Sequence, residues 1–281
     1  MKLTQRWINP VLEKEFRLRM RTIRSPLALF AYLTVIGLLA LGYIFIEMEN
    51  RGARGFTPDS SRFLFYFLSG AQIVLICFMA PGLCAGVISG EREKQTLNIL
   101  LTTQQSSAAI ILSKLFSALS FMFLVVFATL PIYSIVFLYG GISPGQLIAV
   151  FLFYVLTMLM LGSLGVLFST LFKKTVVAVI VTYGVGLFLY VFTALTALFF
   201  MSTGTLRNTF RETAGMLIGL NPLASLISLF EPDFSEEFFR NAWAGVKLWH
   251  IFVPFHLLVS IAAVLLAIRF LRPRMKTRRA N

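Results

Sequence analysis

The residues most able to do chemistry in this sequence are four alternating charges that close a long apolar run. Glu91, Arg92, Glu93 and Lys94 follow Gly90 directly. If Gly90 is the N-cap of a helix, Glu93 takes the third helical position, which predicts a start that resembles a capping box. Glutamates in the first turn also suit the positive end of the helix dipole. The spacing therefore predicts that a short helix begins at these charges.

Three leucines follow the charges at helical spacing. Leu97, Leu100 and Leu101 form an apolar ridge, and the polar, uncharged segment 102–107 separates it from the next apolar run. A short amphipathic helix of this kind is suited to docking into a groove of a soluble partner. The alternative is a solvated cap that only precedes the next apolar segment. We expect 89–108 to be a surface loop that carries this helix.

Other groups that could support catalysis or bind a metal ion are sparse. The sequence contains no GxxxxGK[ST], HExxH or GxSxG motif, so the common phosphate-loop, zinc and nucleophile signatures are missing. Cys77 and Cys84 lie too far apart on one helix face for a disulfide and are expected to pack in the core. His250 and His256 would point to different faces of a helix, which disfavours a shared metal ion. We expect no enzyme activity, cofactor or metal ion on this chain.

The composition excludes a soluble protein. The 281 residues are 58% hydrophobic and 13% charged, with a mean hydropathy of +0.83 and 29 phenylalanines. Soluble domains carry about 25% charged residues. The net charge of +13 would favour nucleic acid on a soluble chain, but here the basic residues flank apolar segments. Membrane lipid is therefore an expected partner, and nucleic acid is not.

Six apolar segments are long enough to span a membrane. A bilayer core about 30 Å thick needs about 20 apolar helical residues. The third segment continues past Pro131, so it is either kinked or followed by a short outer re-entrant piece. We expect an all-α, polytopic membrane protein with six transmembrane helices. Their expected ranges are 27–46, 64–88, 110–130, 147–171, 176–200 and 249–268.

Charge is distributed unevenly between the two sides that these spans define. The side that holds both termini carries most of the 25 Lys and Arg residues and few of the 12 Asp and Glu residues. On the other side the two kinds of charge nearly balance. Because basic connections stay inside, both termini are expected in the cytoplasm.

Three segments outside the spans have distinct characters. The first, 1–25, is expected to be an amphipathic helix on the inner membrane surface, against the alternative of a charged stop before the first span. The segment 202–247 is expected to be an extracellular loop long enough to hold short helices, and 271–281 is a basic cytoplasmic tail. The apolar face of the first segment includes Leu12, Phe16, Met20 and Ile23.

The spans contain little that could drive transport unaided. Apart from Lys114 and the two histidines, they lack Asp, Glu, Lys, Arg and His. A charge at the bilayer centre costs about 2.5–3.5 kcal/mol on insertion scales and is kept for function, so the missing carboxylates disfavour a proton-coupled carrier. Gly82, Gly86 and Gly90 share one helix face and predict close packing of another helix, within the subunit or across a dimer.

The charged segment resembles a motif of the ABC-2 family of ATP-binding-cassette transporters. Members show a pattern like G-E-[KR]-E-x-G-T-L-x-x-L-L after their second span, and here Gly90 to Lys94 are followed by Gln95, Thr96 and Leu97. Gln95 departs from the frequent Gly. The opening NPVLEKEFRLRMRTIRSPL is similar to the family's connecting helix, and an NPL tripeptide resembles a segment that precedes the last span. The resemblance covers nearly the whole chain.

The resemblance implies a type V exporter fold, with 1–281 as one transmembrane domain and a coupling helix in 89–108. It implies a permease subunit that exports an amphiphilic substrate, such as a lipid, peptide or drug, across a bacterial plasma membrane. ATP and Mg²⁺ would bind to a separate ATPase subunit in two copies, and a second permease subunit, identical or homologous, would complete the path. The residues implied to contact the ATPase are Glu91, Arg92, Glu93, Thr96, Leu97, Leu100 and Leu101.

Two other functions stay open on the sequence alone. The first is a self-contained secondary transporter or channel. The second is a membrane anchor or sensor subunit that transports nothing, although the short cytoplasmic connections leave little room for an effector domain.

Overall fold

The chain is a bundle of helices. The computed structural model describes residues 23–51, 57–102, 105–202, 208–231, 233–239 and 245–271, and these ranges contain no strand. Six of the described helices are long and apolar enough to cross a membrane, which confirms the expected all-α, polytopic architecture. These are α2 (Arg24–Arg51), α3 (Pro58–Cys84), α6 (Ser107–Phe127) with its continuation α7 (Leu130–Leu138), α8 (Pro144–Leu171), α9 (Thr175–Ser202) and α13 (Leu248–Leu271).

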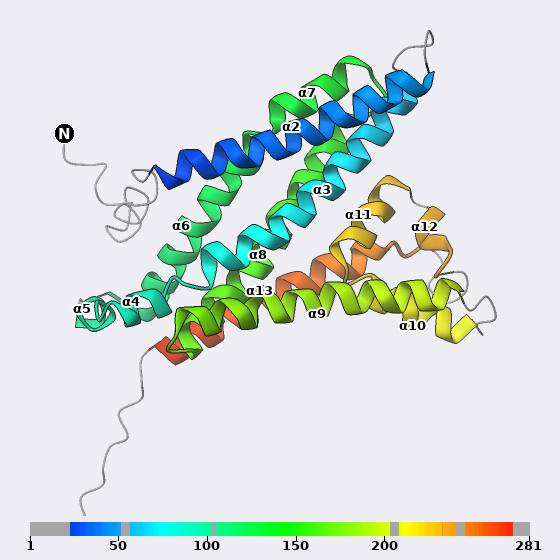
Figure 1. The fold of residues 1–281 in the computed structure, drawn as a ribbon. Coiled ribbons are helices and arrows are strands. Elements are labelled where there is room, and N and C mark those ends of the chain that lie inside the picture. The colour runs from blue at the N-terminus through cyan, green and yellow to red at the C-terminus, as the bar shows by residue number, and fades with distance from the viewer. Residues whose placement is uncertain are drawn as a thin grey trace, which may run out of the picture.

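Shorter helices connect the spans at both ends of the bundle. Two follow α3, and three lie between α9 and α13 (Figure 1). They are α4 (Ser89–Glu93), α5 (Leu97–Thr102), α10 (Asn208–Ile218), α11 (Pro222–Phe230) and α12 (Asp233–Glu236).

Polar caps set the starts of two spans. Thr57 precedes α3, and its Oγ1 accepts a hydrogen bond from the backbone N–H of Ser60 at 3.3 Å. Ser143 precedes α8, where its Oγ accepts from the Gln146 N–H and the Gln146 side chain accepts from the Ser143 N–H, a complete capping box. Proline is the first helical residue in both cases, where its missing N–H costs no hydrogen bond.

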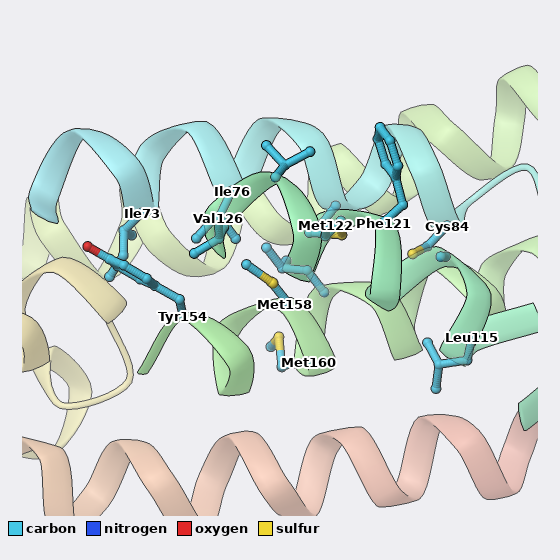
Figure 2. Packing of buried hydrophobic residues seen from close by; sticks show 14 of the residues in the cluster. Ile73, Ile76, Cys84, Leu115, Phe121, Met122, Val126, Tyr154, Met158 and Met160 are labelled. Atoms are coloured by element: carbon cyan, nitrogen blue, oxygen red, sulfur yellow. The ribbon is translucent and has the colours of Figure 1, made fainter. Parts of the chain in front are cut away.

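The helix α8 lies at the centre of the bundle. In its most apolar stretch 56% of the residues are buried, compared with 17% in α2 and 17% in α9. It contacts α3, α6, α9, α11 and α13. Figure 2 shows Ile76, Val126, Met122 and Met158 gathered where α3, α6 and α8 meet. Because lipid tails are as apolar as these side chains, close packing rather than escape from water holds this core together.

The third span bends and continues. Between α6 and α7 the buried Thr129 accepts a hydrogen bond from the Gln72 amide at 3.1 Å. Tyr133 on α7 donates to the Gln72 carbonyl oxygen at 2.6 Å. The stretch Ser107–Leu138 forms one candidate span, so the part after Pro131 continues the span and is not a separate re-entrant piece.

The segment after α9 folds back into the bundle. The helical segments Glu212–Ile218 and Pro222–Phe230 meet at an angle of 106°. Together they are apolar enough for a broken span or a re-entrant loop. The second of them, α11, packs against α3, α8 and α13. Asn221 holds the corner, since its amide donates to the Tyr190 carbonyl (2.7 Å) and to the Thr193 hydroxyl (3.0 Å) on α9. The described residues of the expected extracellular loop 202–247 thus form short helices, and one of these, α11, packs against the spans.

The described ends of the chain lie at one end of the bundle. In Figure 1 the start of α2, the helices α4 and α5, the turn between α8 and α9 and the end of α13 are all at the left, whereas α10, α11 and α12 are at the right. The even number of spans requires this arrangement. It also brings the charged segment after α3 next to the short turn between α8 and α9.

Candidate functional site

The N-terminus of α4 is capped by a side chain from α8. The Ser169 Oγ on α8 accepts hydrogen bonds from the backbone N–H groups of Ile88 (2.8 Å) and Ser89 (2.9 Å). The first N–H groups of a helix have no partners inside it, and the N-cap residue Ile88 offers no side-chain cap. The predicted capping box is wrong, because Gly90 lies inside α4 rather than at its N-cap, and Glu93 binds elsewhere.

Arg92 caps the end of α8. Its two terminal nitrogens donate to the backbone carbonyls of Thr170 (3.0 Å) and Phe172 (3.1 Å). The last carbonyls of a helix lack partners within the helix and carry partial negative charge. The forked guanidinium matches this pair of acceptors, so Arg92 fixes α4 to the end of α8.

Glu93 caps the start of α9. One carboxylate oxygen accepts from the backbone N–H of Thr175 at 2.8 Å, and the other accepts from the Thr175 hydroxyl at 2.9 Å. A negative charge at a helix N-terminus is stabilised by the helix dipole and by the free N–H groups. The residues of the short connection between α8 and α9, 172–174, are thereby held between two charges of α4.

Glu91 joins α4 to α6 and to the turn that follows. One of its oxygens lies 3.2 Å from the Lys114 ammonium on α6. The Thr96 hydroxyl donates to the Glu91 carboxylate and to its backbone carbonyl. The three alternating charges therefore reach three different helices, α6, α8 and α9, from one short helix.

Gln95 makes the break between α4 and α5. Its φ of +58° lies in the left-handed region, which glycine adopts without steric cost and other residues rarely enter. The family pattern places Gly at this position, and the geometry gives the reason. The single amphipathic helix expected from the sequence is thus two helices, α4 and α5, joined at Gln95.

The leucine ridge faces the bundle. Leu97 is 6% exposed and belongs to the main core, and Leu101 packs against that core while half-buried. The side chain of Leu100 lies outside the described residues. Glu93 and Thr96 are exposed, together with three neighbours that the sequence analysis did not select. These neighbours are Lys94, Gln95 and Asn98.

The glycine stripe runs from Gly82 at the end of α3 through Gly86 in the following turn to Gly90 in α4, and it faces α9 within the same subunit. A Cβ on Gly82 would lie 3.2 Å from the Tyr183 hydroxyl, and a Cβ on Gly86 would lie 3.1 Å from the Thr175 Cγ2. Gly90 also faces Thr175, at 3.8 Å. Of the two alternatives for this stripe, the described structure uses packing inside the subunit, and the small residues let α9 approach α3 closely.

An apolar cavity of about 290 Å³ lies between α3, α9 and the start of α11. Its lining comes from helices that are distant in the sequence, and none of the described lining side chains carries a charge. Tyr183 and Tyr190 border it on α9. The apolar part of its wall includes Ile73, Cys77, Phe78, Leu187, Val191 and Leu223.

The remaining predicted residues occupy ordinary positions. Cys84 is buried against α8, and the two histidines lie on different parts of α13. His256 is buried with its Nδ1 3.0 Å from the Phe252 carbonyl, and His250 accepts from the backbone N–H of Lys247. Among the described residues no group of three His, Cys, Asp or Glu side chains could hold a metal ion.

Two predicted segments fall largely outside the described residues. Leu12, Phe16 and Met20 of the connecting helix lie there, as does the basic tail beyond Leu271. Ile23 is described and is 82% exposed just before α2. The surface helix and the tail stay predictions.

Sequence reasoning missed Ser169 and Thr175, the partners of the charged segment. Each lies close to the Lys173–Lys174 pair that separates two apolar runs. A hydroxyl residue directly before an apolar run is a usual helix-start signal, so Thr175 could have been recognised as the start of α9. Nothing local connects either residue with 88–93, about 80 positions earlier.

The fold defines a polytopic helical membrane protein. Its site is the charged helix α4, which is bonded to three other helices at the end of the bundle where both described termini lie. The family model for "ABC-2 family transporter protein" matches residues 10–273, nearly the whole chain. The chain therefore belongs to the ABC-2 transporter family and is a membrane permease component of that class. A search of the curated proteins finds no match.

Proposed function

We propose that this permease is the membrane subunit of an exporter powered by a separate ATPase, and that the α4–α5 segment is its docking surface. The observation that carries the proposal is the anchoring of α4. Hydrogen bonds and an ion pair connect it to α6, α8 and α9. A force applied to so short a helix therefore reaches several spans at once, as a coupling element requires.

The charge distribution supports placing this end of the bundle in the cytoplasm. Among the described residues, the end with α4 and α5 holds two glutamates, Glu91 and Glu93, against seven basic residues. These are Arg24, Arg92, Lys94, Lys114, Lys173, Lys174 and Arg269. The opposite end is rich in Asp and Glu. Basic connections remain inside during insertion, so both termini would be cytoplasmic in a bacterial plasma membrane.

The contact surface would combine the selected residues with their exposed neighbours. The proposed ATPase contact is the set Glu91, Arg92, Glu93, Thr96, Leu97, Leu100 and Leu101, with Lys94, Gln95 and Asn98 added because they are exposed. Within this set, Glu91, Arg92 and Leu97 would act by holding α4 and α5 in place. The exposed turn around Gln95 would touch the partner.

The apolar cavity supports an amphiphilic substrate. Its uncharged lining between α3, α9 and α11 suits a hydrocarbon or aromatic group and would reject a charged one. Export would follow when nucleotide binding draws two ATPase subunits together beneath two permease subunits, identical or homologous. No cofactor is required on this chain, because ATP and Mg²⁺ would bind to the ATPase.

Affinity purification of the full-length protein from its native membrane tests this proposal. We expect a soluble protein with a Walker A sequence to co-purify and to show vanadate-sensitive ATPase activity. Recovery of the permease with no ATPase, even after crosslinking, would contradict the proposal. Transport in liposomes without any ATPase would favour a self-contained carrier, and ATPase binding without transport would favour an anchor or sensor subunit.

Charge reversal at the exposed turn tests the docking surface. Lys94→Glu should weaken ATPase binding at least several-fold, because interfacial charge pairs set specificity and association rate. Lys247→Glu makes the same change at the start of α13, at the opposite end of the bundle, and should leave binding unchanged. Equal binding by both variants would exclude the α4–α5 turn as the contact.

A further inference from the structure

We infer that α4 and the first turn of α9 move as one body, so that displacement of the α4–α5 segment is delivered to α9 and, through α9, to α11. This inference rests on the proposed function for the origin of the displacement. The mechanical link itself depends only on contacts within the chain.

The link is a set of hydrogen bonds between two short stretches. Residues 88–93 bond to residues 169–175 through the Ser169 hydroxyl, the Arg92 guanidinium and the Glu93 carboxylate. The Ser169 and Arg92 bonds end on α8 and the residue after it, and the two Glu93 bonds end on Thr175 of α9; we call the whole set the α4–α9 clamp. All of these bonds except the one between the Thr175 hydroxyl and Glu93 satisfy a backbone group at a helix end that the helix itself leaves without a partner. Sliding of α4 along α8 or α9 would therefore expose several such groups in succession.

Steric contact reinforces the clamp. A Cβ on Gly86 would lie 3.1 Å from the Cγ2 of Thr175, so the backbone of the turn between α3 and α4 is already close to the start of α9. Further along, the Tyr183 hydroxyl donates to the Phe78 carbonyl at 2.5 Å. The two helices are thus joined tightly at the end that carries α4.

Away from the clamp the same two helices separate. Figure 1 shows α3 and α9 diverging from α4 toward the opposite end, with α11 beside them there. The cavity of about 290 Å³ opens between them. Asn221 fastens the start of α11 to α9 through Tyr190 and Thr193. A small tilt of α9 at the clamp would therefore move α11 and change the width of the cavity.

Thr175 is the position at which the α9 end of the clamp can be cut without substituting any residue of the proposed ATPase contact. Thr175→Pro removes both donors to Glu93, the backbone N–H and the hydroxyl, while proline is well tolerated as the first residue of a helix. Thr175→Ser keeps both donors and serves as the conservative variant. Glu237→Ala removes an exposed acidic side chain outside the clamp and is the matched control.

Distance measurements between spin labels test the link without an ATPase. The labels are placed at Asn98 on α5 and Ile180 on α9, in a cysteine-free background of the full-length protein in nanodiscs. They report the distance between these two helices. We expect one narrow distance distribution in the parent, in Thr175→Ser and in Glu237→Ala, and a clearly broader one in Thr175→Pro. An unchanged distribution in Thr175→Pro would overturn the inference, whatever the ATPase does.

The complex with the co-purified ATPase provides the second measurement. A label pair at Leu38 on α2 and Ile180 on α9 should change its distance when ATP binds. Thr175→Pro should lose that change, while a pair at Leu38 and Thr102, an exposed residue of α5 outside the proposed ATPase contact, keeps it. Transport per ATP hydrolysed should fall about five-fold in Thr175→Pro and recover in Thr175→Ser. If α9 still moves with ATP in Thr175→Pro, the clamp does not transmit the displacement. If ATP moves no pair in the parent, the proposed function fails, and the first measurement still decides the link.

Discussion

Lys114 points its ammonium at Glu91 from a buried position: the Nζ lies 3.2 Å from a carboxylate oxygen, the lysine side chain is 2% exposed and the glutamate 30%. A buried ammonium deprived of its carboxylate is expensive, because the low-dielectric surroundings cannot replace water. The pair therefore fixes the position of α4 over α6. It also explains how a lysine is accommodated near the end of an otherwise apolar span.

Removing the carboxylate should harm the protein more than removing both charges. We expect Glu91→Gln to destabilise the protein by about 1–3 kcal/mol, less than for a fully buried pair because Glu91 is partly exposed. Lys114→Met together with Glu91→Gln should recover part of that loss, because no buried charge is left. Thermal unfolding of the detergent-solubilised protein measures both. A double variant less stable than Glu91→Gln alone would refute this explanation.

The backbone at Gln95 gives a second prediction. Gln95→Gly should be neutral or stabilising by up to about 1 kcal/mol, because glycine adopts a positive φ without strain, although it also gains entropy in the unfolded chain. Gln95→Val should destabilise by about 1 kcal/mol, since a branched Cβ fits this region poorly. The midpoint of thermal unfolding and hydrogen exchange of residues 94–98 report the two effects. Equal behaviour of both variants would mean that the turn does not keep this conformation.

Two glycines in different helices should respond in opposite ways to alanine. A Cβ on Gly165 of α8 would lie 2.9 Å from the Cys84 Cβ and 3.1 Å from the Ala85 nitrogen, so part of the backbone would have to move. We expect Gly165→Ala to cost about 1–3 kcal/mol. Around Gly184 of α9 nothing lies within 4 Å, and Gly184→Ala should stabilise the helix by up to about 1 kcal/mol. Thermal unfolding of the two variants side by side checks the contrast, and a loss of stability in Gly184→Ala would contradict it.

The buried polar group at the bend of the third span makes a fourth prediction. Gln72 bonds to Thr129 and Tyr133, and the Tyr133 hydroxyl also lies 3.1 Å from that of Tyr154. Hydrogen bonds between membrane helices are each worth about 0.6 kcal/mol and at most about 1.7 kcal/mol. Gln72→Leu should therefore cost about 1–3 kcal/mol and Tyr133→Phe less than that. A double-mutant cycle measured by reversible unfolding should show coupling between the two residues, and strictly additive losses would mean that the bond contributes nothing.

Span positions were predictable because the membrane imposes a length and a polarity that a sequence displays directly. All six expected spans are present, and α8 matches its expected range closely, 147–171 against Pro144–Leu171. The glycine stripe was also recognisable as a packing face, but its spacing could not reveal that α9 of the same subunit covers it. Similarly, Pro131 indicated a disturbance of the third span, and only the contacts of Thr129 decided that the span bends and continues.

The charged segment shows where local reasoning failed. Glu93 fits a capping box by spacing, yet its carboxylate binds Thr175, and the start of α4 is capped by Ser169. A capping rule assumes that the partner of a free N–H lies a few residues away. Here the nearest available partners come from α8 and α9, which the folding of the bundle brings to the same place.

The bent helix pair around Pro222 was the largest feature that the sequence left open. The stretch around Pro222 is short, and its apolar residues are too few for a span of their own, so composition indicated only short helices in an outer loop. The insertion of α11 between the spans depends on Asn221 reaching the backbone of α9 and on packing against α3, α8 and α13. Such contacts exist only once the spans have assembled.

The sequence by itself therefore determined the membrane class, the number of spans, the sidedness of charge and the resemblance to ABC-2 permeases, because each depends on composition or on residues adjacent in the chain. Tertiary structure decided which helix each charge of the segment 91–93 holds, which helix covers the glycines and where the apolar cavity opens. Those outcomes depend on hydrogen bonds between helix ends and residues about 80 positions away in the sequence. No local sequence pattern indicates which of these distant residues will be the partner.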